Sequence, residues 1–304
     1  MDSSMELKPT FLGLPSCELS TAEVIIVPIP FELTVSYCEG TEMGPQATIA
    51  ASQQVEVDDQ DLGVDLSKIA FHTAPAWSSD AGSLAEQLES ISEHVGLLST
   101  ENGLPIFLGG EHGILPAIVR SIMRSERASK ELTIIQIDAH ADLRDQLGGD
   151  SFSHACAARR ALDEGATRLL QIGVRAWCAE EIDFSQKDPR VETWTARSIM
   201  APSSGTHAWD DWLEQISRIE GPVHLTIDID GIDAPFVPGT GTPVHGGLTF
   251  WHVVETIEGV FSAPNAAVIS ADICEIAPDP DGGIITPFLA AQLAAKIAAA
   301  YSIS

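Results

Sequence analysis

Histidine and aspartate side chains gather at three places in the chain, each directly after a short apolar run. The three motifs are GGEH at 109–112, DAHAD at 138–142 and DIDGID at 228–233. Together they supply six candidate metal ligands: His112, Asp138, His140, Asp142, Asp228 and Asp230.

The spacing within these motifs favours a metal site. Alternate residues of an extended segment point the same way, so Asp138, His140 and Asp142 can converge, as can Asp228 and Asp230. Four carboxylates in one pocket need a cation to offset their repulsion, and two divalent ions match their charge. Oxygen-rich ligation with some imidazole suits Mn²⁺ better than Zn²⁺. A lone Asp-x-Asp is often only a turn or a helix cap, but two such clusters together with GGEH indicate a metal site. Six ligands exceed what one tetrahedral ion takes, which favours two ions bridged by shared carboxylates.

Buried strands would have to position these motifs. Short apolar runs that are typical of parallel strands alternate with stretches of helical spacing, which predicts right-handed βαβ units. The carboxyl ends of parallel strands form the binding crevice of such a sheet, which would bring the motifs together. We expect one domain over residues 1–304, with the acidic segment Glu56–Asp65 as a surface loop. The predicted strands are Glu23–Ile29, Leu104–Leu108, Leu132–Ile137, Leu169–Val174, His224–Ile229 and Ala266–Ala271, and the predicted helices are Ile114–Ala128, Ala155–Glu164, Trp209–Ile219, Thr249–Val260 and Pro287–Ala300.

The net charge and the composition argue against several classes of protein. The 304 residues include 16 Lys+Arg and 44 Asp+Glu, a net charge of −28, which argues against nucleic-acid and anionic-membrane surfaces. Such an acidic chain would also suit salty surroundings. The five cysteines are widely spaced without a CxxC pair, which fits neither a disulfide scaffold nor a zinc finger. With no signal-peptide pattern and no apolar run of transmembrane length, we expect a cytoplasmic protein.

The motifs resemble those of the ureohydrolases, the arginase and agmatinase family, and are most like agmatinases. Further matching segments are 29–45 (IPFELTVSYCEGTEMGP), 153–160 (SHACAARR), 238–243 (PGTGTP), 246–249 (GGLT) and 272–278 (DICEIAP). The resemblance implies a three-layer α/β/α arginase-like fold with a central, mainly parallel eight-stranded sheet. It also implies two Mn²⁺ per subunit and a homo-trimer or homo-hexamer.

The resemblance also implies roles for single residues. One Mn²⁺ would be held by His112, Asp138, Asp142 and Asp228, and the other by Asp138, His140, Asp228 and Asp230. His154 would act as a proton shuttle, and Glu275 would hold the guanidinium of the substrate. Substrate-loop candidates are Asp233, Glu39, Glu42 and His245; for Asp233 a strand-end cap and for His245 an exposed loop position are the alternatives. The chain departs from the commoner pattern at Glu111, where Asp is frequent, and at Gly113, where Ser is frequent.

The implied reaction is hydrolysis of a guanidino group to urea and an amine by a water that Mn²⁺ activates. Glu39, Glu42 and the negative field favour a small dication over a guanidino acid, which makes agmatine, converted to putrescine plus urea, the expected substrate. Guanidinobutyrate, guanidinopropionate, free guanidine and formiminoglutamate remain alternatives within the family. Outside it, the alternatives are a catalytically silent metal-binding homologue and a metal-dependent deacetylase, whose related site typically holds a single zinc.

Overall fold

The structure is a computed structural model that describes residues 9–99, 103–125, 131–201, 207–278 and 283–304. Its centre is an eight-stranded sheet in the order β4-β1-β5-β10-β9-β6-β7-β8, and every pairing in this sheet is parallel. The predicted α/β fold with a parallel eight-stranded sheet is therefore confirmed. The strands are β1 (Val24–Ile29), β4 (Phe71–Thr73), β5 (Leu104–Gly109), β6 (Thr133–Ile137), β7 (Arg168–Val174), β8 (Val191–Thr195), β9 (Glu220–Asp228) and β10 (Asn265–Cys274).

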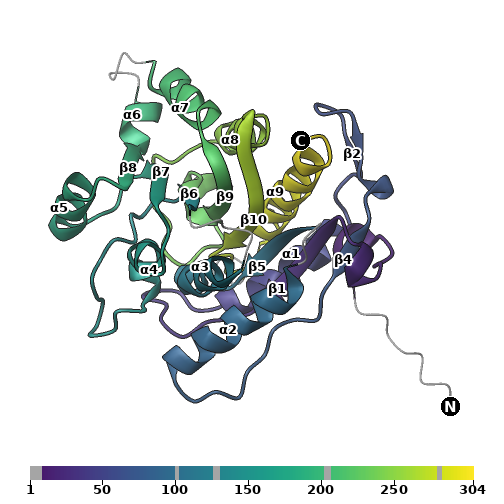
Figure 1. The fold of residues 1–304 in the computed structure, drawn as a ribbon, viewed down its shortest axis with the longest axis horizontal. Coiled ribbons are helices and arrows are strands. Elements are labelled where there is room, and N and C mark those ends of the chain that lie inside the picture. The colour runs from purple at the N-terminus through teal and green to yellow at the C-terminus, as the bar shows by residue number, and fades with distance from the viewer. Residues whose placement is uncertain (1–8, 100–102, 126–130, 202–206, 279–282) are drawn as a thin grey trace.

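Helices cover both faces of the sheet (Figure 1). Successive strand residues enter opposite cores: Ile106 and Leu108 pack into one hydrophobic cluster and Phe107 into the other. The first cluster includes residues of α1, α7, α8 and α9, and the second includes residues of α2, α3 and α4. The helices are α1 (Gly44–Ser52), α2 (Leu84–Leu98), α3 (Leu115–Arg124), α4 (Ala157–Asp163), α5 (Ala179–Lys187), α6 (Ala196–Met200), α7 (Ala208–Ser217), α8 (Phe250–Phe261) and α9 (Ile285–Ser302).

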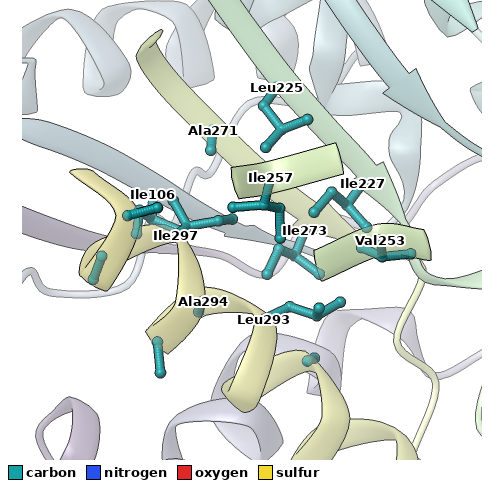
Figure 2. Close-up of a cluster of buried hydrophobic side chains, with 14 of the residues drawn as sticks. Ile106, Leu225, Ile227, Val253, Ile257, Ala271, Ile273, Leu293, Ala294 and Ile297 are labelled. Carbon is teal, nitrogen blue, oxygen red and sulfur yellow. The ribbon is translucent and has the colours of Figure 1, made fainter. Parts of the chain in front are cut away.

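The core beneath α8 and α9 shows why the central strands are apolar on both sides. Ile106 of β5, Leu225 and Ile227 of β9 and Ile273 of β10 meet aliphatic side chains of the two helices (Figure 2). The alanines of α9 are small, which lets this long helix lie close against the sheet. The same strands therefore hold their carboxyl ends rigidly in place.

The predicted elements differ from the structure mainly at their ends. Ile229 leaves β9 and enters a 3-10 turn, and β10 continues three residues past Ala271, through Cys274. The described part of the Ile114–Ala128 helix ends at Arg124, and residues 126–130 lie outside the described residues. The Glu56–Asp65 segment lies at the surface, with every residue exposed or half-buried, and within it Asp58–Asp59 (β2) and Val64–Asp65 (β3) form a short antiparallel pair. Its Asp59 makes an ion pair with Lys296 of α9 at 2.6 Å, which ties the segment to the core.

The strand order places the three sequence motifs side by side. Strands β5, β10, β9 and β6 are consecutive neighbours at the centre of the sheet. The chain passes from β5 to β6 across a gap that β9 and β10 fill later, so the strand order changes direction there. Ligands of open parallel sheets bind at such a switch point. No helix among the described residues is both long enough and apolar enough to cross a bilayer.

Candidate metal centre and active-site cavity

Three central strands, β5, β6 and β9, deliver the candidate ligands. His112 begins the 3-10 turn after β5, Asp138 directly follows β6, Asp228 ends β9, and Asp230 lies in the turn behind it. All six candidates converge, and every one except the half-buried His140 is buried.

The carboxylates surround the two imidazoles as two overlapping groups. His112 Nδ1 lies 3.2 Å from Asp138 Oδ2, 3.0 Å from Asp142 Oδ2 and 3.6 Å from Asp228 Oδ2. His140 Nδ1 lies 3.1 Å from Asp230 Oδ2 and 3.6 Å from Asp138 Oδ1. His112, Asp138 and Asp228 form one group able to hold an ion, and Asp138, His140 and Asp230 form another. Asp138 belongs to both groups, as a bridging carboxylate would.

The charges of this cluster are unbalanced without cations. Burial and the neighbouring Asp138 raise the pKa of Asp142 to about 6, and burial and Asp230 raise the pKa of Asp228 well above its usual value. Burial alone would lower the pKa of His140, but the carboxylates of Asp230 and Asp138 raise it to about 12. The protein thus collects buried negative charge that protons neutralise only in part. Metal ions are the natural counter-charge for such a set.

The environment of His112 fits metal ligation. Its buried Nδ1 has no hydrogen-bond partner within the described residues and faces the carboxylates. On the other side of the ring, Nε2 lies 2.8 Å from Thr226 Oγ1. The Thr226 hydroxyl donates its own proton to Asp272 Oδ1 at 2.8 Å, so it must accept from Nε2–H of His112. Burial would lower the pKa of His112, but Asp138 and Asp142 raise it well above its usual value. A bound metal would therefore displace the proton on Nδ1, while Nε2–H keeps its contact with Thr226.

The chain of buried polar groups continues behind Asp272. Its Oδ2 lies 2.7 Å from His224 Nε2, and His224 Nδ1 lies 2.7 Å from Ser270 Oγ. None of these three side chains is more than 2% exposed. Asp272 is therefore fixed on both oxygens, and through Thr226 it fixes the orientation of His112.

Arg175 holds the loop that carries Asp230. It follows β7 and donates from its guanidinium to the carbonyls of Asp230 at 2.8 Å, Ile232 at 3.2 Å and Val244 at 2.7 Å. Burial lowers the pKa of Arg175, although nearby carboxylates act in the opposite direction. Three of the carbonyls that Arg175 contacts, those of Asp230, Gly231 and Ile232, belong to the DIDGID turn, so its guanidinium holds this turn in place.

His154 and Glu275 lie beside the ligands. His154 Nδ1 is 3.4 Å from Glu275 Oε1, and that oxygen also accepts from the His112 amide at 2.7 Å. Burial would lower the pKa of His154, but Glu275 raises it to about 9. Glu275 and Asp142 have φ angles of 64° and 53°, in the left-handed region that non-glycine residues seldom adopt. Strained backbone at both positions is typical of functional sites.

A cavity of about 210 Å³ opens above the cluster. His140, Asp142 and Asp228 form its floor, His154 lies on its wall, and Arg144 and Glu181 also line it. Glu181 accepts from the amides of Leu143 at 3.2 Å and Cys178 at 2.8 Å, and lies 3.8 Å from Arg144 Nε. A basic group therefore reaches the cavity, which the sequence reasoning did not anticipate.

The substrate-loop candidates lie outside this cavity. Asp233 Oδ1 accepts from the amides of Gly246 at 2.6 Å and Gly247 at 3.2 Å, which is the alternative role of a loop cap. His245, Glu39 and Glu42 are exposed, and none of them lines the cavity. Glu42 lines a different hollow, beside β1 and β4.

Comparison with known proteins decides the family. The sequence model of the arginase family matches residues 22–300. The chain belongs to the arginase family. An N(1)-aminopropylagmatine ureohydrolase of Synechocystis is 35% identical over 289 residues, covering 91% of this chain and 88% of the relative. An agmatinase of Pyrococcus horikoshii is 33% identical, with 93% of each chain covered. The agmatine ureohydrolase of Thermoplasma volcanium has a similar structure, with a TM-score of 0.84 at 26% identity over 99% of this chain and 96% of the other.

Membership of this enzyme family confirms the resemblance read from the motifs and favours a ureohydrolase over a deacetylase. The arginase-family site contains several residues that the motifs did not single out. Arg175 directly follows a predicted strand, as the candidate ligands do. This position in the sequence could have identified it as a site residue. Thr226, Asp272 and His224 carry no such signal, because their contacts join neighbouring strands and depend on register.

Proposed function

We propose that this chain is a Mn²⁺-dependent ureohydrolase that cleaves a small guanidino compound to urea and an amine, with agmatine as the first candidate substrate. The observation that carries the proposal is the pair of His/Asp groups that share Asp138 beneath the cavity. The names of the relatives support agmatine. We also propose that the protein works in the cytoplasm as a homo-trimer or homo-hexamer.

The roles of the side chains follow from their positions. His112, Asp138, Asp142 and Asp228 would hold one Mn²⁺, and Asp138, His140, Asp228 and Asp230 the other. When bound there, Mn²⁺ would lower the pKa of a water toward neutrality and would so supply hydroxide as the nucleophile.

Two side chains would act on the guanidino group itself. Glu275 Oε1 is engaged by the His112 amide, while its Oε2 takes part in no hydrogen bond among the described residues. We assign Oε2 to orienting the guanidinium by charge-assisted hydrogen bonds. His154 Nε2 is buried and has no partner in the described structure. With its raised pKa, the imidazole can hold a proton near neutral pH and deliver it to the leaving amine.

The test is a urea-release assay on purified protein loaded with Mn²⁺, using a panel of guanidino compounds. Release of one urea per amine from at least one compound, lost after chelation and restored by Mn²⁺, is expected. Absence of urea release from the whole panel, with two metals bound per chain, would refute the enzymatic proposal.

Arg144 favours a second candidate, a guanidino acid such as guanidinobutyrate. The guanidinium of Arg144 lies on the cavity, and its only ion pair among the described residues is the 3.8 Å contact with Glu181. A substrate carboxylate could accept bidentate hydrogen bonds from it. Glu39 and Glu42 lie away from the cavity, so their charges do not favour a dication over a guanidino acid there.

Arg144→Gln separates the two candidates. If the tail carries a carboxylate, the variant should lose kcat/KM for guanidinobutyrate, by about 5- to 150-fold for a charged hydrogen bond of about 1–3 kcal/mol, and should keep its rate on agmatine. If the tail carries an ammonium, removal of the like charge should leave or raise the rate on agmatine. Equal kcat/KM values before and after the change, on both compounds, would show that Arg144 does not contact the tail.

A further inference from the structure

Glu111, one of the two departures from the commoner motif, is fully buried beside the metal cluster. It follows β5 and lies directly before His112, but its side chain turns away from the ligands. Glu111 Oε2 accepts from the amides of Leu33 at 2.8 Å and Thr34 at 2.6 Å. Its Oε1 accepts from the hydroxyl of Thr34 at 2.7 Å. Three donors thus converge on this carboxylate from the segment that follows β1.

That hydroxyl is also connected to the active site. Thr34 Oγ1 accepts a hydrogen bond of 2.8 Å from the backbone amide of His154. Because the hydroxyl proton goes to Glu111, the oxygen lone pairs are turned toward His154. The amide it accepts belongs to the first residue of the 3-10 turn that precedes α4 and carries the imidazole into the cavity.

Gly113, the second departure, makes room for this arrangement. A Cβ at Gly113 would lie 2.7 Å from Glu111 Oε1, closer than real Cβ contacts allow. The carboxylate cannot easily move aside, since three hydrogen bonds hold it. The long side chain of Glu111 and the absence of a side chain at Gly113 therefore depend on each other.

We infer that Glu111, through the hydroxyl of Thr34, is a positioning residue for His154, and that Gly113 provides the space this contact needs. The role in turnover rests on the proposed function, whereas the contact itself is a property of the fold. His154 donates its backbone amide to a fixed oxygen, so the start of its turn is held against the segment around Thr34.

Thr34→Val tests the link, because it removes the hydroxyl and keeps the shape. We expect kcat to fall about 3- to 10-fold, as for one lost hydrogen bond. KM should stay within about twofold and the metal content unchanged, since the ligands and the cavity floor are untouched. Thr34→Ser keeps the hydroxyl and is the matched control, with kcat close to that of the unchanged protein.

Hydrogen exchange provides a readout that needs no substrate. The amide of His154 should exchange about 3- to 10-fold faster in Thr34→Val and at the normal rate in Thr34→Ser. Unchanged exchange in Thr34→Val, or equal acceleration in both variants, would overturn the inference even if no substrate is found. A protein that releases no urea would contradict the proposed function and leave the exchange result decisive for the contact.

A separate set of variants tests whether the Glu111 carboxylate needs the space at Gly113. Gly113→Ala should lower the melting temperature and speed exchange at His154, because the new methyl displaces the Glu111 carboxylate. In the double variant Glu111→Asp/Gly113→Ala the shorter acid avoids the methyl, so the loss of melting temperature should be smaller than the sum of the losses in the two single variants. Exchange at His154 should stay fast, because the shorter acid no longer reaches Thr34. Additive losses of melting temperature in the double variant would refute the coupling.

Discussion

Replacing Thr226 by valine should weaken metal binding without touching a ligand. Thr226 is fully buried, and valine has nearly the same shape, so packing is kept. What is lost is the acceptor for His112 Nε2–H and the donor to Asp272 Oδ1. A buried donor left without a partner costs about 1–3 kcal/mol.

The unpaired Nε2–H of His112 destabilises the metal-bound form of the variant. In the metal-free variant the imidazole of His112 can give up its Nε2 proton and keep the one on Nδ1, which faces Asp142 Oδ2 at 3.0 Å. Metal binding requires the lone pair on Nδ1 and so forces the proton back to Nε2, where valine offers no acceptor. The cost converts to about a 5- to 150-fold weaker affinity, and losses of about 10–100-fold are typical when a ligand's hydrogen-bond partner is removed.

The assay is calorimetric titration of the metal-free protein with Mn²⁺, together with its free energy of unfolding in urea. Thr226→Ser is the control, since it restores a hydroxyl between His112 and Asp272. We expect the valine variant to bind Mn²⁺ about 10–100-fold more weakly and the serine variant to bind normally. Wild-type affinity in Thr226→Val, or a loss of affinity in Thr226→Ser as large as in the valine variant, would refute the role assigned to this hydroxyl.

Three further predictions concern single residues. Asp138→Asn should lower bound metal below two ions per chain and nearly abolish urea release, whereas two tightly bound ions in elemental analysis would contradict the bridging role. His154→Asn should keep its metal but slow turnover about 10²–10⁴-fold; a normal rate in steady-state assays would exclude proton transfer by this group. Lys296→Met should lower the free energy of unfolding by about 1–3 kcal/mol, because Lys296 is only 8% exposed and its ammonium pairs with Asp59 at 2.6 Å and Glu258 at 3.2 Å. Lys68→Met, at an exposed ion pair, is the control and should stay within about 0.5 kcal/mol in urea denaturation.

The parts of the fold that the sequence predicted are those set by local pattern. Doubly buried strands are continuous apolar runs, and all six predicted strands lie in the sheet. The short edge strands Phe71–Thr73 and Val191–Thr195 were missed. Three residues are too few for a periodic signal, and β8 is half-buried with the sequence VETWT, which is neither a continuous apolar run nor a regular alternation. The helix at 84–98 was also missed, although Ser83 and Glu86 form a capping box at its start.

The site was predictable where its residues follow strands and unpredictable where they meet across the sheet. All six proposed ligands converge, since parallel strands end at one edge. The placement of Arg144 on the cavity depends on the path of a loop that no local pattern specifies. Glu39 and Glu42 were predicted to lie at the substrate loop because they belong to a matching segment, but both residues are exposed to solvent.

The two Asp-x-Asp-like motifs also show why a turn and a metal site need not be alternatives. Asp138 Oδ1 accepts from the amide of His140, two residues on, at 2.6 Å, and Asp228 Oδ1 accepts from the amide of Asp230 at 2.9 Å. In both cases the other oxygen, Oδ2, faces His112 Nδ1, at 3.2 Å and 3.6 Å. One oxygen of each carboxylate therefore fixes the turn that presents the next ligand, as aspartate does in ordinary turns. The second oxygen is thereby held at the cluster, so the same spacing that caps a strand end also positions a carboxylate that we propose as a bridging ligand.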